Sequence, residues 1–168
     1  MLLIGLFTIA FLCYYKVVDN TFCFNEKQKA HIVEYLWSII LPIFSLKVLT
    51  DIYFDNSLLE KGYTPLSDRL LEIYLSGTLV DFILCYKEYP IYFTKITIIH
   101  HILWLSFGLT ALYNNASIYG AFVYFIEVPC IVKCWNKFFP NLKNILLFAR
   151  TWIVFRIFYF ATIVPFLM

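Results

Sequence analysis

Long apolar stretches alternate with short polar ones along the whole chain. The longest lies between Lys95 and Glu127, where 31 consecutive residues carry no formal charge. The polar sequence Tyr113-Asn114-Asn115 divides this stretch into two parts, each close to the length that crosses a bilayer as a helix. The pattern therefore predicts two membrane-spanning helices joined by a turn.

Six stretches approach the roughly 20 residues that a spanning helix needs. Lipid offers no hydrogen-bonding partner to the backbone, so helices are expected rather than open sheets. Pro42 and Pro129 fall inside spans and are expected to kink them. The first stretch lacks the basic start and the cleavage pattern of a signal peptide, and is predicted to be a span. The predicted spans are 1–18, 32–49, 70–87, 94–112, 116–134 and 144–167.

Composition supports a membrane protein. Of 168 residues, 62% are hydrophobic and only 14% are charged, which is more apolar surface than a water-soluble domain of this size can bury. The fold predicted is an all-α, multi-pass transmembrane bundle with one domain over residues 1–168. A net charge of +2, scattered along the chain, argues against a nucleic-acid partner.

The basic residues indicate an orientation. Eight lysines lie in the loops after the first, third and fifth spans. On the opposite side of the membrane the basic residues are only Lys47, Lys61 and Arg69. The positive-inside rule places these three loops in the cytoplasm and the N-terminus on the lumenal side. The eight are Lys16, Lys27, Lys29, Lys87, Lys95, Lys133, Lys137 and Lys143.

Ionisable residues recur at one depth in four predicted spans. A rise of 1.5 Å per residue places them roughly 9 Å below the cytoplasmic surface, with Arg156 deeper and Glu34 shallower. Such residues are costly in hydrocarbon and are expected to face a protected interior. The residues at the common depth are Asp81, His100, His101, Glu127 and Arg150.

Two interpretations of this polar layer stay open. The groups could form a structural network that holds the helices together, at modest energy per contact. Alternatively they could line a chamber open to the cytoplasm, in which a histidine accepts a proton or an acyl group. Adjacent helical residues differ by about 100° in direction, so His100 and His101 are expected to play different parts. No metal-binding motif is present, and the five cysteines suit apolar packing.

Several short motifs occur in a specific order. Asp81 precedes Ile98-Ile99-His100-His101, which Tyr119-Gly120, Glu127 with Pro129, and Phe155-Arg156-Ile157 follow. Together they resemble the TLC domain of ceramide synthases and of small TLC-domain-containing membrane proteins, over about residues 30–165. The resemblance implies helices around a cavity that accepts lipid, in the endoplasmic reticulum or a related membrane.

The resemblance also implies roles for individual residues. His100 and His101 would be the catalytic candidates for acyl acceptor or general base, and Asp81 would orient them. Glu127 and Arg156, with Arg150, would form the polar network of the lipid cavity. The partners would be membrane lipids, with acyl-CoA as a possible co-substrate and a sphingoid base as acceptor, and with no resident cofactor or metal.

Three functional hypotheses follow. The first is an acyl-CoA-dependent N-acyltransferase of sphingolipid metabolism that uses the histidine pair. The second is a non-catalytic lipid-binding protein that regulates membrane composition. The third is a cargo-sorting receptor, although the chain has no C-terminal retrieval signal. Substrate turnover separates the first from the other two.

Overall fold

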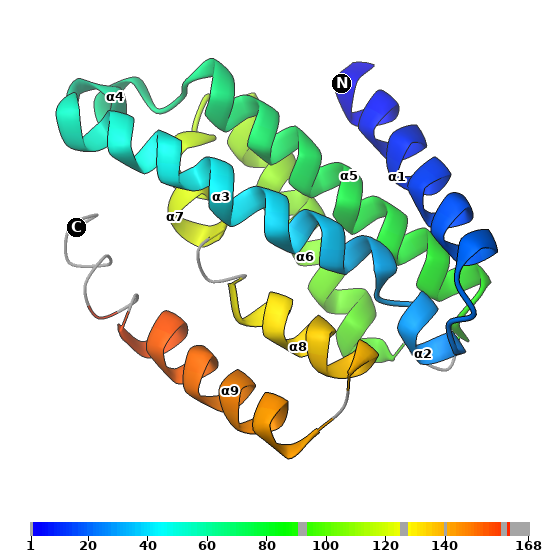
Figure 1. Cartoon of the computed structure of the whole chain (residues 1–168). Coiled ribbons are helices and arrows are strands. Elements are labelled where there is room, and N and C mark those ends of the chain that lie inside the picture. The colour runs from blue at the N-terminus through cyan, green and yellow to red at the C-terminus, as the bar shows by residue number, and fades with distance from the viewer. Residues whose placement is uncertain (1, 91–93, 125–127, 140, 159–160, 162–168) are drawn as a thin grey trace.

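The computed structural model of the chain describes residues 2–90, 94–124, 128–139, 141–158 and 161. Within these ranges all regular elements are helical and no strand occurs, which confirms the all-α prediction (Figure 1). The elements are α1 (Leu2–Thr21), α2 (Glu26–Lys29), α3 (Ile32–Phe54), α4 (Ser57–Lys61), α5 (Pro65–Lys87), α6 (Lys95–Tyr113), α7 (Ile118–Tyr124), α8 (Val128–Phe138), α9 (Leu142–Trp152) and the π-helical segment η3 (Ile153–Phe158).

Polar side chains define where three of the helices begin. The Asn25 side chain accepts a hydrogen bond from the backbone of Gln28, whose side chain bonds back to the Asn25 backbone. Thr64 and Ser67 form the same reciprocal arrangement before α5. The hydroxyl of Thr94 accepts from the backbone of Thr97 at the start of α6. These bonds satisfy amide groups that have no partner within the helix.

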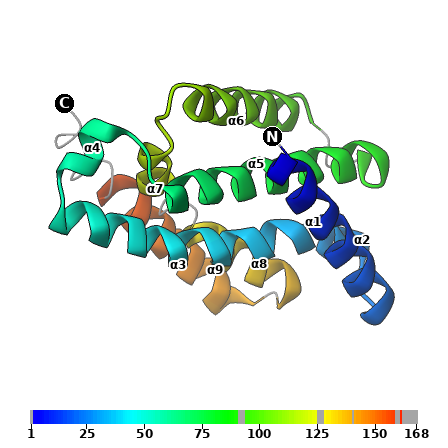
Figure 2. The same ribbon diagram turned by 90° about the horizontal axis from the view of Figure 1, so that it is seen from above.

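Helix α5 lies at the centre of the bundle (Figure 2). It packs against α1, α3, α6 and α7, and α3 also packs against α7 and α8. α1 runs parallel to α5, because the Ser76 hydroxyl donates to the Ile4 carbonyl at 3.0 Å while Tyr15 bonds to Glu88 at 2.6 Å. α3 and α6 run antiparallel to α5, with Trp37 beside Gly77 and Gly108 beside Leu75.

The contrast between α5 and α6 suits a bundle that is surrounded by lipid. α5 carries five charged residues and is the most extensively buried long helix. α6 carries one charged residue, and Gly108 is its one buried residue. Large apolar side chains on α6 face outward, as expected when the surrounding solvent is lipid. The exposed examples include Ile99, Leu103, Phe107 and Leu109.

Among the described residues, three helices are long and apolar enough to span a membrane: α1 from Leu3, α3 and α6. The helices α7 and α8 form a possible fourth span with a bend of 43° between them. The prediction of membrane-spanning helices is thus confirmed, whereas six spans around a cavity are not established by these helices. α5 has 23 residues and is long enough to span a membrane, but its charged residues make it less apolar than these helices.

Pro42 and Pro129, which were expected to kink their spans, lie at different places in their helices. α3 continues through Pro42 as one helix from Ile32 to Phe54. Pro129 is the second residue of α8, a position at which proline needs no hydrogen-bonded amide. The predicted span over 116–134 is therefore two shorter helices, α7 and α8, and α8 continues to Phe138.

The two ends of the bundle are tied by different contacts. At the end that contains α2, the Gln28 side chain donates to the carbonyl of Phe138 at 3.3 Å, and Lys29 pairs with Asp19. At the end that contains α4, the Ile118 amide donates to the Gly62 carbonyl at 3.0 Å. Gly62 has a φ of 78°, and a Cβ there would lie 2.4 Å from the carbonyl oxygen of Asn115. Glycine is required at this turn.

Candidate functional site: a polar cavity inside the bundle

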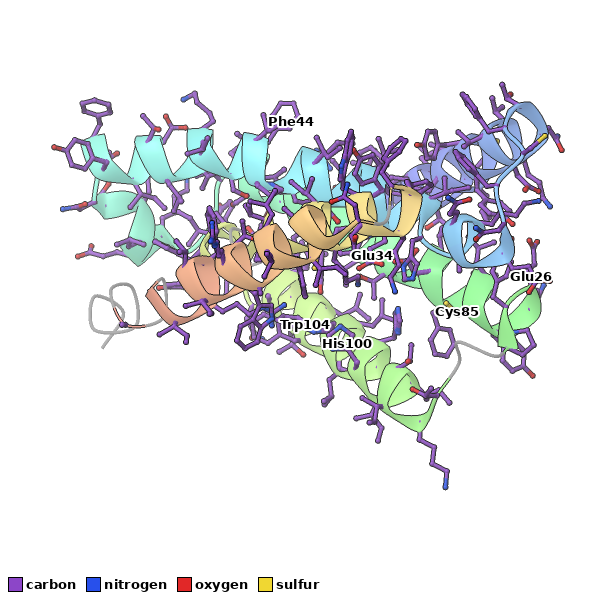
Figure 3. All side chains as sticks on the ribbon, turned by 60° about the horizontal axis from the view of Figure 1, so that its bottom comes forward. Glu26, Glu34, Phe44, Cys85, His100 and Trp104 are labelled. Carbon is purple, nitrogen blue, oxygen red and sulfur yellow. The ribbon has the colours of Figure 1, made fainter. Side chains whose placement is uncertain are left out.

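A cavity of about 480 Å³ lies among α3, α5, α6, α8, α9 and η3, toward the α2 end. This volume is within the range of sites that bind small molecules. Figure 3 shows Glu34, Cys85 and His100, from three different helices, around this region. The polar and ionisable residues in its wall are His31, Glu34, Thr78, Asp81, Cys85, Thr97, His100, His101, Cys130, Lys133 and Arg156.

The first polar cluster in the wall is a three-residue ion-pair network. Lys133 on α8 pairs with one carboxylate oxygen of Glu34 on α3. The other oxygen contacts Nδ1 of His31 at 2.6 Å. The Glu34 side chain is 13% exposed, so the network neutralises a carboxylate that is almost removed from solvent. This pairing stabilises the contact between α3 and α8.

Asp81 forms the second cluster, with Trp37. The indole N–H of Trp37 donates to Oδ2 of Asp81 at 3.3 Å. Asp81 is 7% exposed, and its other oxygen, Oδ1, is buried without a hydrogen-bond partner. Asp81 was predicted to orient the histidine pair, but Trp37 is the residue that it bonds within the described part of the chain. The cavity wall thus contains a carboxylate oxygen that can accept a further hydrogen bond.

His100 and His101 both line the cavity and make different contacts. Nδ1 of His101 donates to the Thr97 carbonyl at 2.8 Å. This bond fixes the proton on Nδ1 and leaves Nε2 with a free lone pair. The His101 ring contacts Phe82 of α5 edge-on, and the His100 ring contacts Trp104. Their ring centroids are 5.8 Å apart.

The three other predicted site residues have different positions. Arg156 lies in η3 and lines the cavity, with its guanidinium 5.6 Å from the centroid of the Trp152 ring. The Arg156 Nε is buried and has no hydrogen-bond partner among the described residues. Arg150 is exposed on α9 and does not line the cavity, so it is not part of the polar layer. Glu127 lies outside the described residues.

Sequence reasoning missed the pairing of Glu34 with Lys133. Glu34 was placed above the layer and Lys133 in a cytoplasmic loop, whereas α8 continues past Lys133 and turns it into the cavity. His31, which lines the cavity, was not among the predicted site residues. The spacing of His31 and Glu34, three residues apart, was the available signal, because such residues are neighbours on a helical turn.

One group of side chains has a spacing that suits a metal ion. Ligand atoms of His31, Glu34 and Cys134 lie within 4.8 Å of one another. Both carboxylate oxygens of Glu34 are already in contact, with His31 and with the Lys133 ammonium. A cation would have to displace Lys133, so the ion pair accounts for this cluster better than a metal does.

Comparisons of the chain with protein-family models, with characterised proteins and with solved structures found no match. The resemblance to the TLC domain therefore stays a prediction from short motifs. The positions of Asp81, His100, His101 and Arg156 around one cavity are the basis for a functional proposal.

Proposed function

We propose that this protein is a multi-pass membrane protein that binds the polar head of a membrane amphiphile in the cavity among α3, α5, α6, α8 and α9. The observation that carries the proposal is a set of polar and charged side chains in an otherwise apolar bundle. Ionisable groups at membrane depth are expensive and commonly mark a substrate pathway. A lipid in this cavity would suit a role in lipid metabolism or homeostasis.

In this proposal α5 crosses the membrane as the interior helix of a six-span bundle. Two of its charged residues, Glu72 and Asp81, are buried, and α1, α3 and α6 pack around it. The segment formed by α9 and η3 would be the last span. The α2 end would face the cytoplasm, consistent with the lysines near it, and the membrane would be that of the endoplasmic reticulum.

The cavity also has an apolar boundary through which an acyl chain could leave. Ile96 of α6, and Phe148 and Trp152 of α9, line it on two sides. α6 packs on α5, whereas α9 packs on α8 and η3. A head group held by the polar wall could therefore extend its chain between α6 and α9 toward the surrounding lipid.

Retention of a radiolabelled single-chain amphiphile by the full chain in detergent micelles tests this proposal. Cys130→Trp would fill the cavity from α8, since Cys130 lies in its wall. Cys13→Trp is the matched control, because Cys13 is exposed on α1 and outside the cavity. We expect saturable binding by wild type and by the control, and loss of binding in Cys130→Trp. Equal binding by all three would overturn the proposal.

A second candidate function is acyl transfer, which the tautomer of His101 favours. With Nδ1–H bonded to the Thr97 carbonyl, Nε2 is free to attack an acyl thioester. The acyl group would pass from acyl-CoA to Nε2, releasing the thiol, and then to the amine of a sphingoid base, restoring the imidazole. With labelled acyl-CoA and sphinganine, the wild-type protein would form labelled amide. His100→Ala and His101→Ala would form none. No amide and no acyl label on the wild-type protein would exclude this activity.

A further inference from the structure

Asp81 on α5 and Arg156 on η3, two cavity residues of opposite charge type, form no ion pair within the part of the chain that the structure describes. The Glu34 carboxylate and the Lys133 ammonium neutralise each other in the wall. An unpaired charge is unfavourable in a low-dielectric interior, so a ligand group of opposite sign would stabilise the ionised form of Asp81 and of Arg156.

The buried atoms of these two residues have complementary needs. Among the described residues, Oδ1 of Asp81 is a hydrogen-bond acceptor without a donor, and Nε of Arg156 is a donor without an acceptor. Both residues line the same cavity, from elements far apart in the sequence. An ammonium group supplies N–H donors and positive charge to Asp81, and a phosphate or carboxylate supplies acceptors and negative charge to Arg156.

We infer that the cavity is selective for a zwitterionic, single-chain amphiphile whose primary ammonium group binds Asp81 and whose anionic group binds Arg156. The inference rests on the proposed function and adds the class of head group. A primary ammonium is specified because a quaternary one has no N–H to donate to Oδ1 of Asp81. The chain of the ligand lies along Ile96, Phe148 and Trp152.

Native mass spectrometry of the full chain in a non-ionic detergent can test this selectivity. The protein is offered an equimolar mixture of four compounds with the same 18-carbon chain, and each bound species is identified by its mass. The compounds are lysophosphatidylethanolamine, lysophosphatidylcholine, lysophosphatidic acid and a primary alkylamine. We expect the first to be bound about tenfold over each of the others, the size of one charge-assisted hydrogen bond.

Substitutions of Asp81 and Arg156 test which group of the ligand each residue binds. Asp81→Asn keeps an oxygen for Trp37 and should abolish the preference for the ethanolamine over the choline head group. Arg156→Gln should abolish the preference for lysophosphatidylethanolamine over the alkylamine. Arg150→Gln and Asp51→Asn are matched controls, because Arg150 is exposed, Asp51 is half-buried, and both lie outside the cavity wall. Neither control should change the preference.

The outcomes separate this inference from the function on which it rests. Equal binding of lysophosphatidic acid and lysophosphatidylethanolamine, unchanged by Asp81→Asn, would overturn the selectivity for a zwitterionic head group. The proposed function as an amphiphile-binding protein would then still stand. Absence of binding of all four compounds to folded wild type would overturn both proposals. Free phosphoethanolamine serves as a further arm. If it displaced the lysolipid at equal concentration, the ligand would be a soluble metabolite and the lipid part of the inference would be wrong.

Discussion

The indole of Trp37 on α3 donates a hydrogen bond to Asp81 on α5, with 3.3 Å between nitrogen and oxygen. Both side chains are buried, and both line the cavity. The bond therefore joins two helices and at the same time leaves only Oδ1 of Asp81 for a ligand. The packing of the bundle and the chemistry of the cavity depend on the same pair.

Gly77 controls the position of Trp37. A Cβ at Gly77 would lie 2.5 Å from Cδ1 of the Trp37 ring, too close for both to stay in place. We expect Gly77→Ala to lower the free energy of unfolding by about 1–3 kcal/mol and to weaken the bond to Asp81. Thermal unfolding followed by tryptophan fluorescence measures the effect. Gly5→Ala is the control, since nothing lies within 4 Å of its Cβ position, and it should not be destabilising.

The Glu34–Lys133 pair is expected to stabilise the contact between α3 and α8. Glu34→Gln leaves the Lys133 ammonium, whose side chain is 34% exposed, without its counter-charge. We expect a loss of about 2 kcal/mol, between the values for exposed and for fully buried pairs. Denaturant unfolding in micelles is the measurement.

The pair Lys47–Asp51 provides a control for Glu34→Gln on the same helix. Its side chains are 63% and 38% exposed, so Asp51→Asn should change stability by less than about 1 kcal/mol. If the two substitutions had equal effects, the Glu34–Lys133 pair would not be a principal contact between α3 and α8.

Ser117 joins the opposite end of the bundle to α5. Its hydroxyl is fully buried, contacts the Ser67 hydroxyl at 2.9 Å and donates to Asp68. Ser117→Ala should cost about 1–3 kcal/mol, because it leaves Asp68 without this donor. Ser106→Ala, at an exposed position on α6, should have almost no effect. Equal melting temperatures for the two variants would contradict the assignment.

The fold should lose stability at alkaline pH through Tyr89, which follows the end of α5. Burial raises the pKa of the Tyr89 hydroxyl above the usual value for tyrosine. Because the folded-state pKa is the higher one, this contribution is present below about pH 10, the pKa of an unfolded tyrosine, and is lost as the pH rises through the folded-state value. Unfolding measured between pH 8 and 11 should show a smaller slope for Tyr89→Phe than for wild type.

Tyr113→Phe is the matched control for the alkaline transition. Tyr113 is 88% exposed at the end of α6, so removal of its hydroxyl should leave the slope unchanged. A slope that Tyr89→Phe does not reduce would show that another group causes the alkaline loss of stability.

The sequence was sufficient to predict the helical class and the position of most helices. The apolar pattern predicted 94–112, and α6 covers Lys95–Tyr113, because apolar periodicity and length are local properties. The division of 116–134 into α7 and α8 was missed, since a proline indicates a break but not whether a helix continues through it. Pro42 and Pro129 show both outcomes.

The cavity was predictable in part. Depth along a helix follows from residue number, and Asp81, His100 and His101, which were expected at a common level, line one cavity. The direction in which a side chain points around the helix axis depends on how the helices pack. A span with apolar residues on all faces does not show which face packs against another helix. For this reason Arg150 was wrongly placed in the layer, and Lys133 was wrongly placed in a loop.

The most direct test of the polar cavity is to map where a bound amphiphile attaches. A single-chain lipid with a diazirine in its head group would be photolysed with the full chain in micelles, and the labelled residues identified by mass spectrometry. We predict attachment to cavity residues such as Thr78, Cys85 and Trp37, prevented by Cys130→Trp and not by Cys13→Trp. Attachment of the head group to the outer face of α6, at Leu103 and Phe107, would contradict the proposed site.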